Sequence, residues 1–498
     1  MAGVFNKFVS LIFVFVVRYF FARNLDVELL GLEGLFSNIL GVFSLVDAGL
    51  GSAIAFGLYK PLYENDRDTV SAIMVLYKKV YTVVGVVVLF LSIFVSPFVP
   101  VIIKDTTVEH KSIITFFLVY AIGVAVSYFF AYKRTLVFAI QKNYIVLVID
   151  TITKILLSVL QIAILITIQC YFCYLALVVF FNFLSNVLIS VIVKKNNIYD
   201  EKCNKKLPKE YTKKLITDVK ALAVANISWI GISSTSNIII SSIVGAIDLA
   251  KNANYSTITL NIAAFINMFL GGVSASVGDM LAEANKEKIN RYFFRYNFIY
   301  QFVSGYASVA VFLVSKPFVS LWVGENLVFD VLTTVIISAY LYLTIIFKPL
   351  ADYQNYSGLF IYYKLPSIIA LGIDLIVSIA LGEFFGIKGV FLGLIITYMY
   401  MMICVAYNVH RRLLEISVKK YLMLLLKNIV CILITATSVF LILKLSNVSG
   451  FVEMLFAVLL LTVIYFLVSS IVFFKDESFR FFIDFALKQV KKVLIRRN

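Results

Sequence analysis

The stretch LFSNILGVFSLVDAGLGSAIAFGLYKPL, from Leu35 to Leu62, combines a long apolar run with four glycines and one carboxylate, Asp47. A helix needs about 20 apolar residues to cross a bilayer, and most of this run meets that requirement. Small residues inside such a helix let a neighbouring helix approach closely or let the helix bend, and both interpretations stay open. Asp47 requires a further explanation, because a charge at mid-membrane is costly and seldom faces lipid.

Composition extends this interpretation to the whole chain. Of 498 residues, 61% are hydrophobic and only 14% are charged, whereas soluble proteins carry about 25% charged residues. Apolar runs of this length without alternating polar positions predict helices, so we expect an all-α polytopic membrane protein. The first run, 8–17, is interpreted as a retained helix and not as a cleaved signal. Arg18 interrupts it, and no small-residue cleavage site follows.

Hydropathy predicts fourteen transmembrane helices. They lie near 4–23, 35–57, 73–99, 113–132, 144–168, 171–193, 221–245, 256–281, 294–315, 329–350, 365–382, 386–408, 424–443 and 451–474. With both termini placed in the cytoplasm, the inside segments hold 35 Lys and Arg residues and the outside segments hold 7. That asymmetry follows the positive-inside rule. The net charge of +16 therefore reflects topology and attraction to the inner leaflet, and no nucleic-acid partner is expected.

Internal similarity divides the chain into two halves. AGLGSAI at 48–54 matches GGVSASV at 271–277 at a shift of 223, which also places Asn38 over Asn261. A shift of 224 places Asp150 over Asp374. Two parallel six-helix repeats typify transporters that work by alternating access. The predicted parts are an N-terminal lobe at 1–193, a basic cytoplasmic linker at 194–220, a C-terminal lobe at 221–409, helices 13 and 14 at 410–474, and a basic amphipathic cytoplasmic tail at 475–498.

The charged residues most relevant to a functional site lie inside predicted spans: Arg18, Asp47, Asp150, Lys154 and Asp374. Asp150 and Lys154 are four residues apart, so they share a helix face and can pair. The second lobe has a serine where Lys154 stands in the first, which makes the first lobe the more cationic one. Two interpretations remain open. Either Asp150–Lys154 and Asp47–Arg18 are structural pairs, or these groups line a polar cavity for a charged or hydroxylated cargo.

Enzymatic motifs are missing from the sequence. It has no Walker motif, no GxSxG and only two histidines, so neither nucleotide hydrolysis nor histidine-based catalysis is expected. Cys170 and Cys173 form a CxxC without a second pair or a nearby histidine, which argues against zinc. A disulfide and a pair of small apolar side chains both remain open for them. We expect no enzyme, no metal and no cofactor.

The stretch from Gly34 to Leu62 resembles bacterial polysaccharide repeat-unit flippases, the O-antigen and capsule transporters of the polysaccharide transporter family. The resembling pattern is G..GLFSNIL...SL.D.G.G.AI.F.LYKPL, and AIQKNYI at 139–145 and NYSGLF at 355–360 also resemble that family. The family shares a superfamily with multidrug and toxin extruders and with peptidoglycan lipid flippases. The resemblance implies a bacterial cytoplasmic membrane protein that flips undecaprenyl-diphosphate-linked oligosaccharide for lipopolysaccharide or capsule. It also implies contact with other polysaccharide assembly proteins.

The resemblance gives the buried charges expected roles. Arg18 and Lys154 would bind the diphosphate, since phosphate favours charge-assisted contacts with Arg and Lys. Asp47 and Asp150 would accept sugar hydroxyls, and Asp374 would carry the coupling proton or sodium ion. The equivalent amides Asn38 and Asn261 complete the expected cargo-binding set.

Two other classes of protein remain as alternatives. One is an ion-coupled multidrug or toxin extruder, although extruders typically stop at twelve helices. The other is a membrane glycosyltransferase or polymerase, which would need a sizeable outer loop. The longest outer loop predicted here, around 316–329, has only about fourteen residues.

Overall fold

The computed structural model describes residues 2–43, 57–59, 61–196, 198–200, 203, 207, 231–232, 234–282, 285–357, 359–445 and 450–484. The chain forms two compact units, Met1–Ala253 (unit 1) and Asn254–Asn498 (unit 2). Asp47 and the small residues around it lie outside the described residues, as do most of the predicted linker and 485–498. The predicted lobe boundaries therefore stay a prediction.

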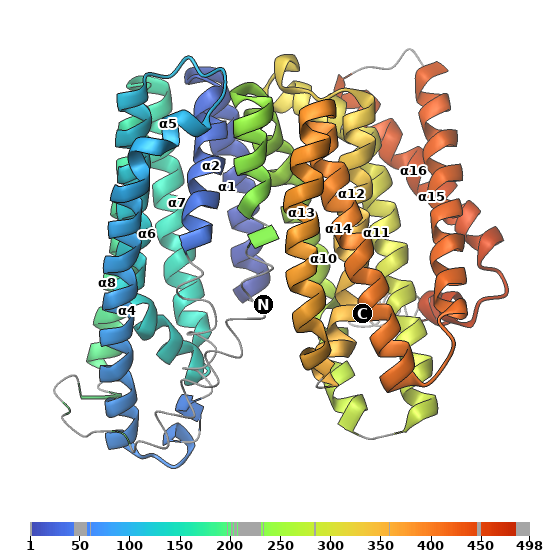
Figure 1. Cartoon of the computed structure of the whole chain (residues 1–498), viewed down its shortest axis with the longest axis horizontal. Coiled ribbons are helices and arrows are strands. Elements are labelled where there is room, and N and C mark those ends of the chain that lie inside the picture. The colour runs from blue at the N-terminus through green and yellow to red at the C-terminus, as the bar shows by residue number, and fades with distance from the viewer. Residues whose placement is uncertain are drawn as a thin grey trace, which may run out of the picture. The chain divides into compact units, whose positions relative to one another are not determined.

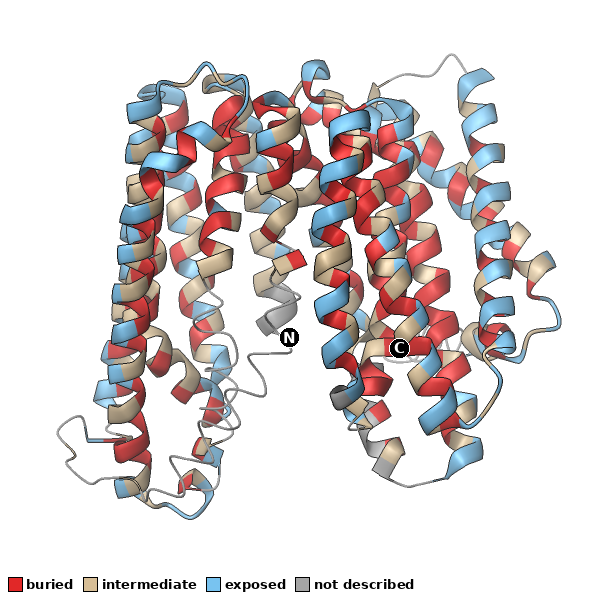
Figure 2. Cartoon of the chain, in the orientation of Figure 1, coloured by how far each residue is buried: buried red, intermediate tan, exposed pale blue. Residues whose placement is uncertain are grey.

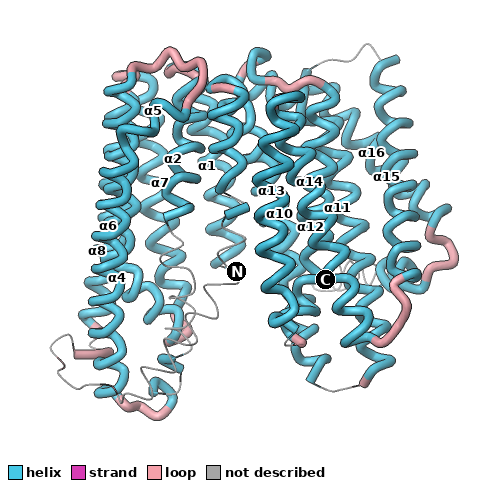
Figure 3. Tube along the Cα trace, in the orientation of Figure 1, coloured by secondary structure: helices cyan, strands magenta, loops and turns pink. Residues whose placement is uncertain are grey.

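Helices make up all the regular structure of the described residues, which contain no strand (Figure 3). Each predicted span overlaps a helix of the described residues, and ten helices there are long and apolar enough to cross a membrane. Large apolar side chains such as Phe90, Leu160 and Ile376 are exposed. Figure 2 shows exposed residues along the length of many helices. Such surfaces suit contact with lipid tails, and the all-α polytopic membrane fold is confirmed.

Unit 1 is a bundle in which α1 packs on α7, α7 on α8, α8 on α6, and α6 on α4 (Figure 1). Its helices are α1 (Ala2–Asn24), α2 (Glu28–Phe43), α4 (Arg67–Val95), α5 (Val99–Ile102), α6 (His110–Ala139), α7 (Asn143–Thr167) and α8 (Tyr171–Lys195). The helix α10 (Ala246–Ala282) begins in unit 1 and continues into unit 2.

Caps and prolines set several of these helix ends. Asp66 caps α4, because its carboxylate accepts a hydrogen bond from the Thr69 backbone N–H at 3.0 Å. Pro97 follows the end of α4, where a short 3₁₀ turn replaces the α-helix. Glu28 at the start of α2 is buried and accepts hydrogen bonds from Thr106 Oγ1 at 2.8 Å and the Thr107 backbone N–H at 2.9 Å. These contacts tie α2 to the loop that precedes α6.

Unit 2 is organised around its longest helix, α11, which packs on α12, α15 and α16. Its helices after α10 are α11 (Lys286–Val323), α12 (Val331–Tyr356), α13 (Lys364–Phe385), α14 (Ile387–Val409), α15 (Lys419–Leu445) and α16 (Gly450–Val472). Aromatic side chains hold α16 on α11, with the Phe302 and Tyr465 ring centroids 5.1 Å apart. The Tyr465 hydroxyl also donates a 2.8 Å hydrogen bond to the Phe302 carbonyl.

The helices α13 and α14 pack more closely than ordinary side chains allow. A Cβ atom on Gly389 would lie 1.8 Å from the Leu381 carbonyl oxygen, and one on Gly393 would lie 2.2 Å from Ser378 Oγ. Gly389 and Gly393 form a GxxxG pair, a spacing that brings membrane helices together. The contact places α14 directly against the helix that carries Asp374.

Candidate functional site

Arg18 on α1 and Glu33 on α2 line a small cavity of about 150 Å³ in unit 1, and the two charges interact electrostatically. Gln161 on α7 and Tyr174 on α8 line the same cavity. Four helices therefore bring charged and polar side chains together with apolar ones in the wall of this cavity. Glu33 gives Arg18 a carboxylate neighbour of the kind that the sequence interpretation assigned to Asp47.

Lys154 on α7 lines this cavity and also a larger one of about 630 Å³. Its charged neighbours are Lys7 on α1 and Asp150 on its own helix. Lys154 is therefore part of the wall of both cavities of unit 1. Arg18 and Lys154, the two predicted diphosphate ligands, line one cavity.

Arg134 on α6 makes a bidentate ion pair with Asp150 in the larger cavity. The two N–H···O distances are 2.9 and 3.0 Å. Ser185 Oγ on α8 donates to Asp150 Oδ1 at 2.7 Å, and Arg134 Nε donates to Asn186 Oδ1 at 2.8 Å. The network links α6, α7 and α8, and planar guanidinium groups suit such two-point contact with carboxylates.

The predicted ion pair between Asp150 and Lys154 is wrong. Within the described residues, the carboxylate of Asp150 pairs with Arg134, and Lys154 is only an electrostatic neighbour. A spacing of four residues brings two side chains to one helix face, but an arginine on the facing helix offers two parallel hydrogen bonds. Asp150 therefore does not neutralise Lys154 through a direct ion pair.

Asp374 on α13 is fully buried in unit 2. Ser378, at the position equivalent to Lys154, donates a 3.2 Å hydrogen bond to Asp374 Oδ1 and lies 3.4 Å from the Val390 carbonyl oxygen. Tyr340 and Tyr398 are electrostatic neighbours of the same carboxyl group. A hydroxyl group donates a hydrogen bond to Asp374, whereas the partners of Asp150 include a guanidinium.

The two predicted amides are turned toward their own helices. Asn38 Nδ2 donates to the Gly34 carbonyl at 2.7 Å, and Asn261 Nδ2 donates to the Thr257 carbonyl at 2.7 Å. Each bond runs back four residues along the helix, which leaves the amide less free to bind sugar. Their role in cargo binding stays a prediction, as does that of Asp47.

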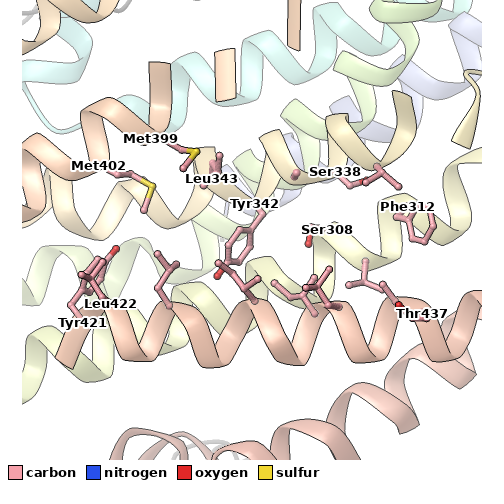
Figure 4. A pocket seen from close by; sticks show the side chains of 18 of the residues that line it. Ser308, Phe312, Ser338, Tyr342, Leu343, Met399, Met402, Tyr421, Leu422 and Thr437 are labelled. Carbon is pink, nitrogen blue, oxygen red and sulfur yellow. The ribbon is translucent and has the colours of Figure 1, made fainter. Parts of the chain in front are cut away.

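A long apolar groove of about 970 Å³ runs through unit 2 between α11, α12, α14 and α15 (Figure 4). Phe312, Leu343, Met399 and Met402 contribute to its wall, and few polar groups interrupt it, among them Ser338. A groove with this lining suits a hydrocarbon chain and not a sugar. Hydropathy did not predict it, because groove-facing and lipid-facing positions are equally apolar.

Three charged groups in the structure were missed by the sequence interpretation. Glu33 fell just before a predicted span, Arg134 fell in a predicted cytoplasmic segment, and Lys348 fell at the cytoplasmic end of a predicted span. In unit 2, Lys348 pairs with Asp352, a buried carboxylate that also accepts a 2.7 Å hydrogen bond from the Tyr296 hydroxyl. All three lie within helices that continue past the apolar core. The sequence did contain a signal for this ion pair, because Lys348 and Asp352 are four residues apart and so share a helix face.

Both thiols of the CxxC are free in the structure. Cys170 caps α8, with its Sγ accepting the Cys173 backbone N–H at 3.4 Å. Within the described residues, no group of three or more His, Cys, Asp or Glu side chains is arranged to hold a metal ion.

Solved transporters share this fold, although no protein-family model and no curated protein matches the sequence. The lipid II flippase MurJ, in an inward closed conformation, superposes with a TM-score of 0.70 at 13% identity over 95% of this chain and 98% of its own. An inward-facing MATE-family multidrug resistance transporter of the MOP superfamily gives 0.59 at 15% identity, over 81% and 94%. A mutant of the Vibrio cholerae MATE transporter VcmN gives 0.56 at 13% identity, over 82% and 96%. The chain thus has a MurJ- and MATE-like polytopic membrane fold.

Proposed function

We propose that this chain is a flippase for undecaprenyl-diphosphate-linked oligosaccharide repeat units in the bacterial cytoplasmic membrane. The observation that carries the proposal is the cavity of unit 1 that Arg18 and Lys154 line together with Glu33. A diphosphate is the anion that two such groups would bind, since Arg and Lys favour phosphate. Arg18 has Glu33 and Lys154 has Asp150 as an electrostatic neighbour, and a bound diphosphate would add negative charge beside both cations.

The apolar groove of unit 2 supports the same cargo. An undecaprenyl chain is a long branched hydrocarbon, and the groove offers a wall of leucine, isoleucine, methionine and phenylalanine. A cargo with a charged head and a hydrocarbon tail needs both kinds of surface, as found in units 1 and 2. The similarity to a lipid II flippase adds support at the level of the fold.

Alternating access with proton or sodium coupling is part of the proposal, and Asp374 is the proposed coupling residue. The termini would lie in the cytoplasm, in line with the 35-to-7 distribution of Lys and Arg. The product would serve surface polysaccharide, O-antigen or capsule assembly, together with other assembly proteins.

Purified full-length chain in vesicles tests the activity directly. The vesicles carry undecaprenyl diphosphate with a fluorescent oligosaccharide, and an impermeant glycosidase is added outside. In protein-free vesicles cleavage stops when the outer leaflet is used up, whereas a flippase brings it to completion. A headgroup-labelled phosphatidylcholine must stay protected in parallel, which separates a flippase from a leak. Cleavage that stops at the protein-free level would rule the function out.

The second candidate is an ion-coupled multidrug extruder, favoured by the likeness to MATE transporters. Those structures cover 81–82% of this chain, and MurJ covers 95%. The same vesicles loaded with a fluorescent lipophilic cation distinguish the two. Cation efflux under an ion gradient, without flipping of the lipid-linked sugar, would assign the extruder function.

A further inference from the structure

A second cavity in unit 2, of about 840 Å³, lies where α11 and α15 begin and α16 ends. We call it the basic cavity. Its wall has two carboxylates, Asp476 and Glu477, and a larger set of cations: Arg291, Arg295, Lys419, Lys420, Lys427 and Lys475. The surplus of positive charge makes the cavity a binding place for an anion.

Only part of this charge is neutralised within the protein. Arg295 pairs with Glu477 at 2.8 Å, and its guanidinium lies 4.3 Å from the Phe481 ring centroid. By contrast, Arg291, Lys419 and Lys427 form no ion pair among the described residues. Their charge is available to a ligand.

Two buried polar atoms in the cavity wall also lack hydrogen-bond partners in the described part of the chain. They are the Nε donor of Arg295 and the Oδ1 acceptor of Asn290. Buried polar groups are nearly always paired in folded proteins, so an unpaired donor and acceptor together point to a missing partner. A ligand with an anionic oxygen and a hydroxyl group offers both complements.

The remaining wall is apolar and includes Phe294, Met423 and Leu424. The cavity lies at the ends of helices that are long and apolar enough to cross a membrane. Helix α15 presents Lys420 and Lys427 to this cavity and Leu422 and Leu425 to the apolar groove, so it has a charged and an apolar side. An amphipathic ligand therefore fits better than a soluble anion.

We propose that the basic cavity binds the headgroup of an anionic phospholipid of the phosphatidylglycerol type. The phosphate diester would sit among the cations, and the glycerol hydroxyls would reach groups such as Asn290. Occupancy by the bilayer's own lipid would hold α11, α15 and α16 together at this end. The site is in unit 2, is built from other residues than the Arg18 and Lys154 cavity, and does not depend on the proposed cargo.

Native mass spectrometry of the full-length chain tests the proposal. Protein in detergent is mixed with phosphatidylglycerol and with phosphatidylcholine of the same acyl chains, and retained lipid is counted. We expect selective retention of phosphatidylglycerol. The double variant Lys420→Gln/Lys427→Gln should bind it at least tenfold more weakly, since each cation near an anionic lipid contributes about fivefold. Glu477→Gln, which releases Arg295, should bind it more tightly.

The matched control is Lys142→Gln/Lys364→Gln, which removes the same charge from exposed lysines outside the cavity. It should retain phosphatidylglycerol like the wild type. Equal losses in both double variants, or no loss in the first, would overturn the proposal. In a third measurement, excess glycerol 3-phosphate is added to the protein with bound phosphatidylglycerol. If it displaces the lipid completely, the cavity is a site for soluble phosphate and the lipid assignment is wrong.

Discussion

Arg134 on α6 clamps Asp150 on α7 through two parallel hydrogen bonds of 2.9 and 3.0 Å. Ser185 on α8 adds a third hydrogen bond to the same carboxylate, at 2.7 Å. The clamp fixes the face of α7 that carries Lys154, one turn further along the helix. The carboxylate of Asp150 is thus held by Arg134 and Ser185, while Lys154 lines the cavity from the same helix.

Breaking the clamp should destabilise unit 1. Both side chains are about one-third exposed, so we expect Arg134→Gln or Asp150→Asn to cost about 1–2 kcal/mol, less than a fully buried pair. Thermal unfolding of the detergent-solubilised protein measures this cost. The double variant should lower the free energy of unfolding by less than the sum of the two single variants, because each single variant already removes the same ion pair. Additive losses would show that the two groups do not act together.

Removing either cation of the small cavity should stop transport without loss of protein. Arg18→Ala and Lys154→Ala should each abolish flipping of the lipid-linked oligosaccharide at normal membrane abundance. Arg18→Lys should keep part of the activity, because the charge survives but the planar fork does not. Lys142→Ala, an exposed lysine at the start of α7, is the control and should transport normally. Full activity of both cavity variants would remove them from the site.

Asp374 should couple transport to the ion gradient. Asp374→Asn keeps a group that accepts the Ser378 hydrogen bond, but it cannot bind or release a proton. We expect flux that persists yet no longer responds to an imposed pH gradient, measured in vesicles. Asp150→Asn should instead leave Arg134 without its carboxylate and reduce stability or cargo binding. An unchanged pH response of Asp374→Asn would assign coupling elsewhere.

The α13–α14 contact should not tolerate a methyl group at Gly393. The added Cβ would lie 2.2 Å from Ser378 Oγ, and overpacking of this kind typically costs about 1–3 kcal/mol. Gly393→Ala should therefore lower the melting temperature and disturb the Ser378–Asp374 hydrogen bond. Gly372→Ala on α13 is the matched control, because its Cβ meets no atom within 4 Å. Equal melting temperatures of the two variants would contradict the contact.

Asp330, which precedes α12, should make the stability of the folded protein depend on pH. Partial burial raises the pKa of its carboxyl, but hydrogen bonds from Thr333 and Lys388 and the Lys388 charge outweigh this and leave the pKa below its usual value. A lowered folded-state pKa stabilises the protein above the unfolded-state pKa, and this stabilisation is lost as pH falls through the folded value.

Melting temperatures from pH 7 to pH 3 test this expectation. Asp330→Asn should melt below the wild type at pH 7, and the difference should shrink toward pH 3 as Asp330 becomes protonated. The Lys388–Asp330 distance of 2.9 Å makes Lys388→Gln the partner variant, which should show the same trend. A difference that stays constant over this range would exclude a role for the charge.

The sequence by itself determined the class of fold. Apolar runs of about 20 residues can only be helices in lipid, so an all-α polytopic membrane fold follows from composition and length. The structure places a helix at each predicted span of the described residues. The equivalence of Asp150 and Asp374 stays a prediction from the internal similarity of the two halves.

Tertiary structure alone decided which charges meet. Hydropathy ends a span at its first charged residue, whereas α6 continues past Arg134 to Ala139 and so carries the guanidinium to Asp150. Glu33 was missed for the same reason at the start of a span. Neighbouring positions on a helix are fixed by the chain, but partners on other helices depend on rotation and packing. The sequence could therefore propose Lys154 for Asp150, and only the packing of α6 against α8 and α7 selects Arg134.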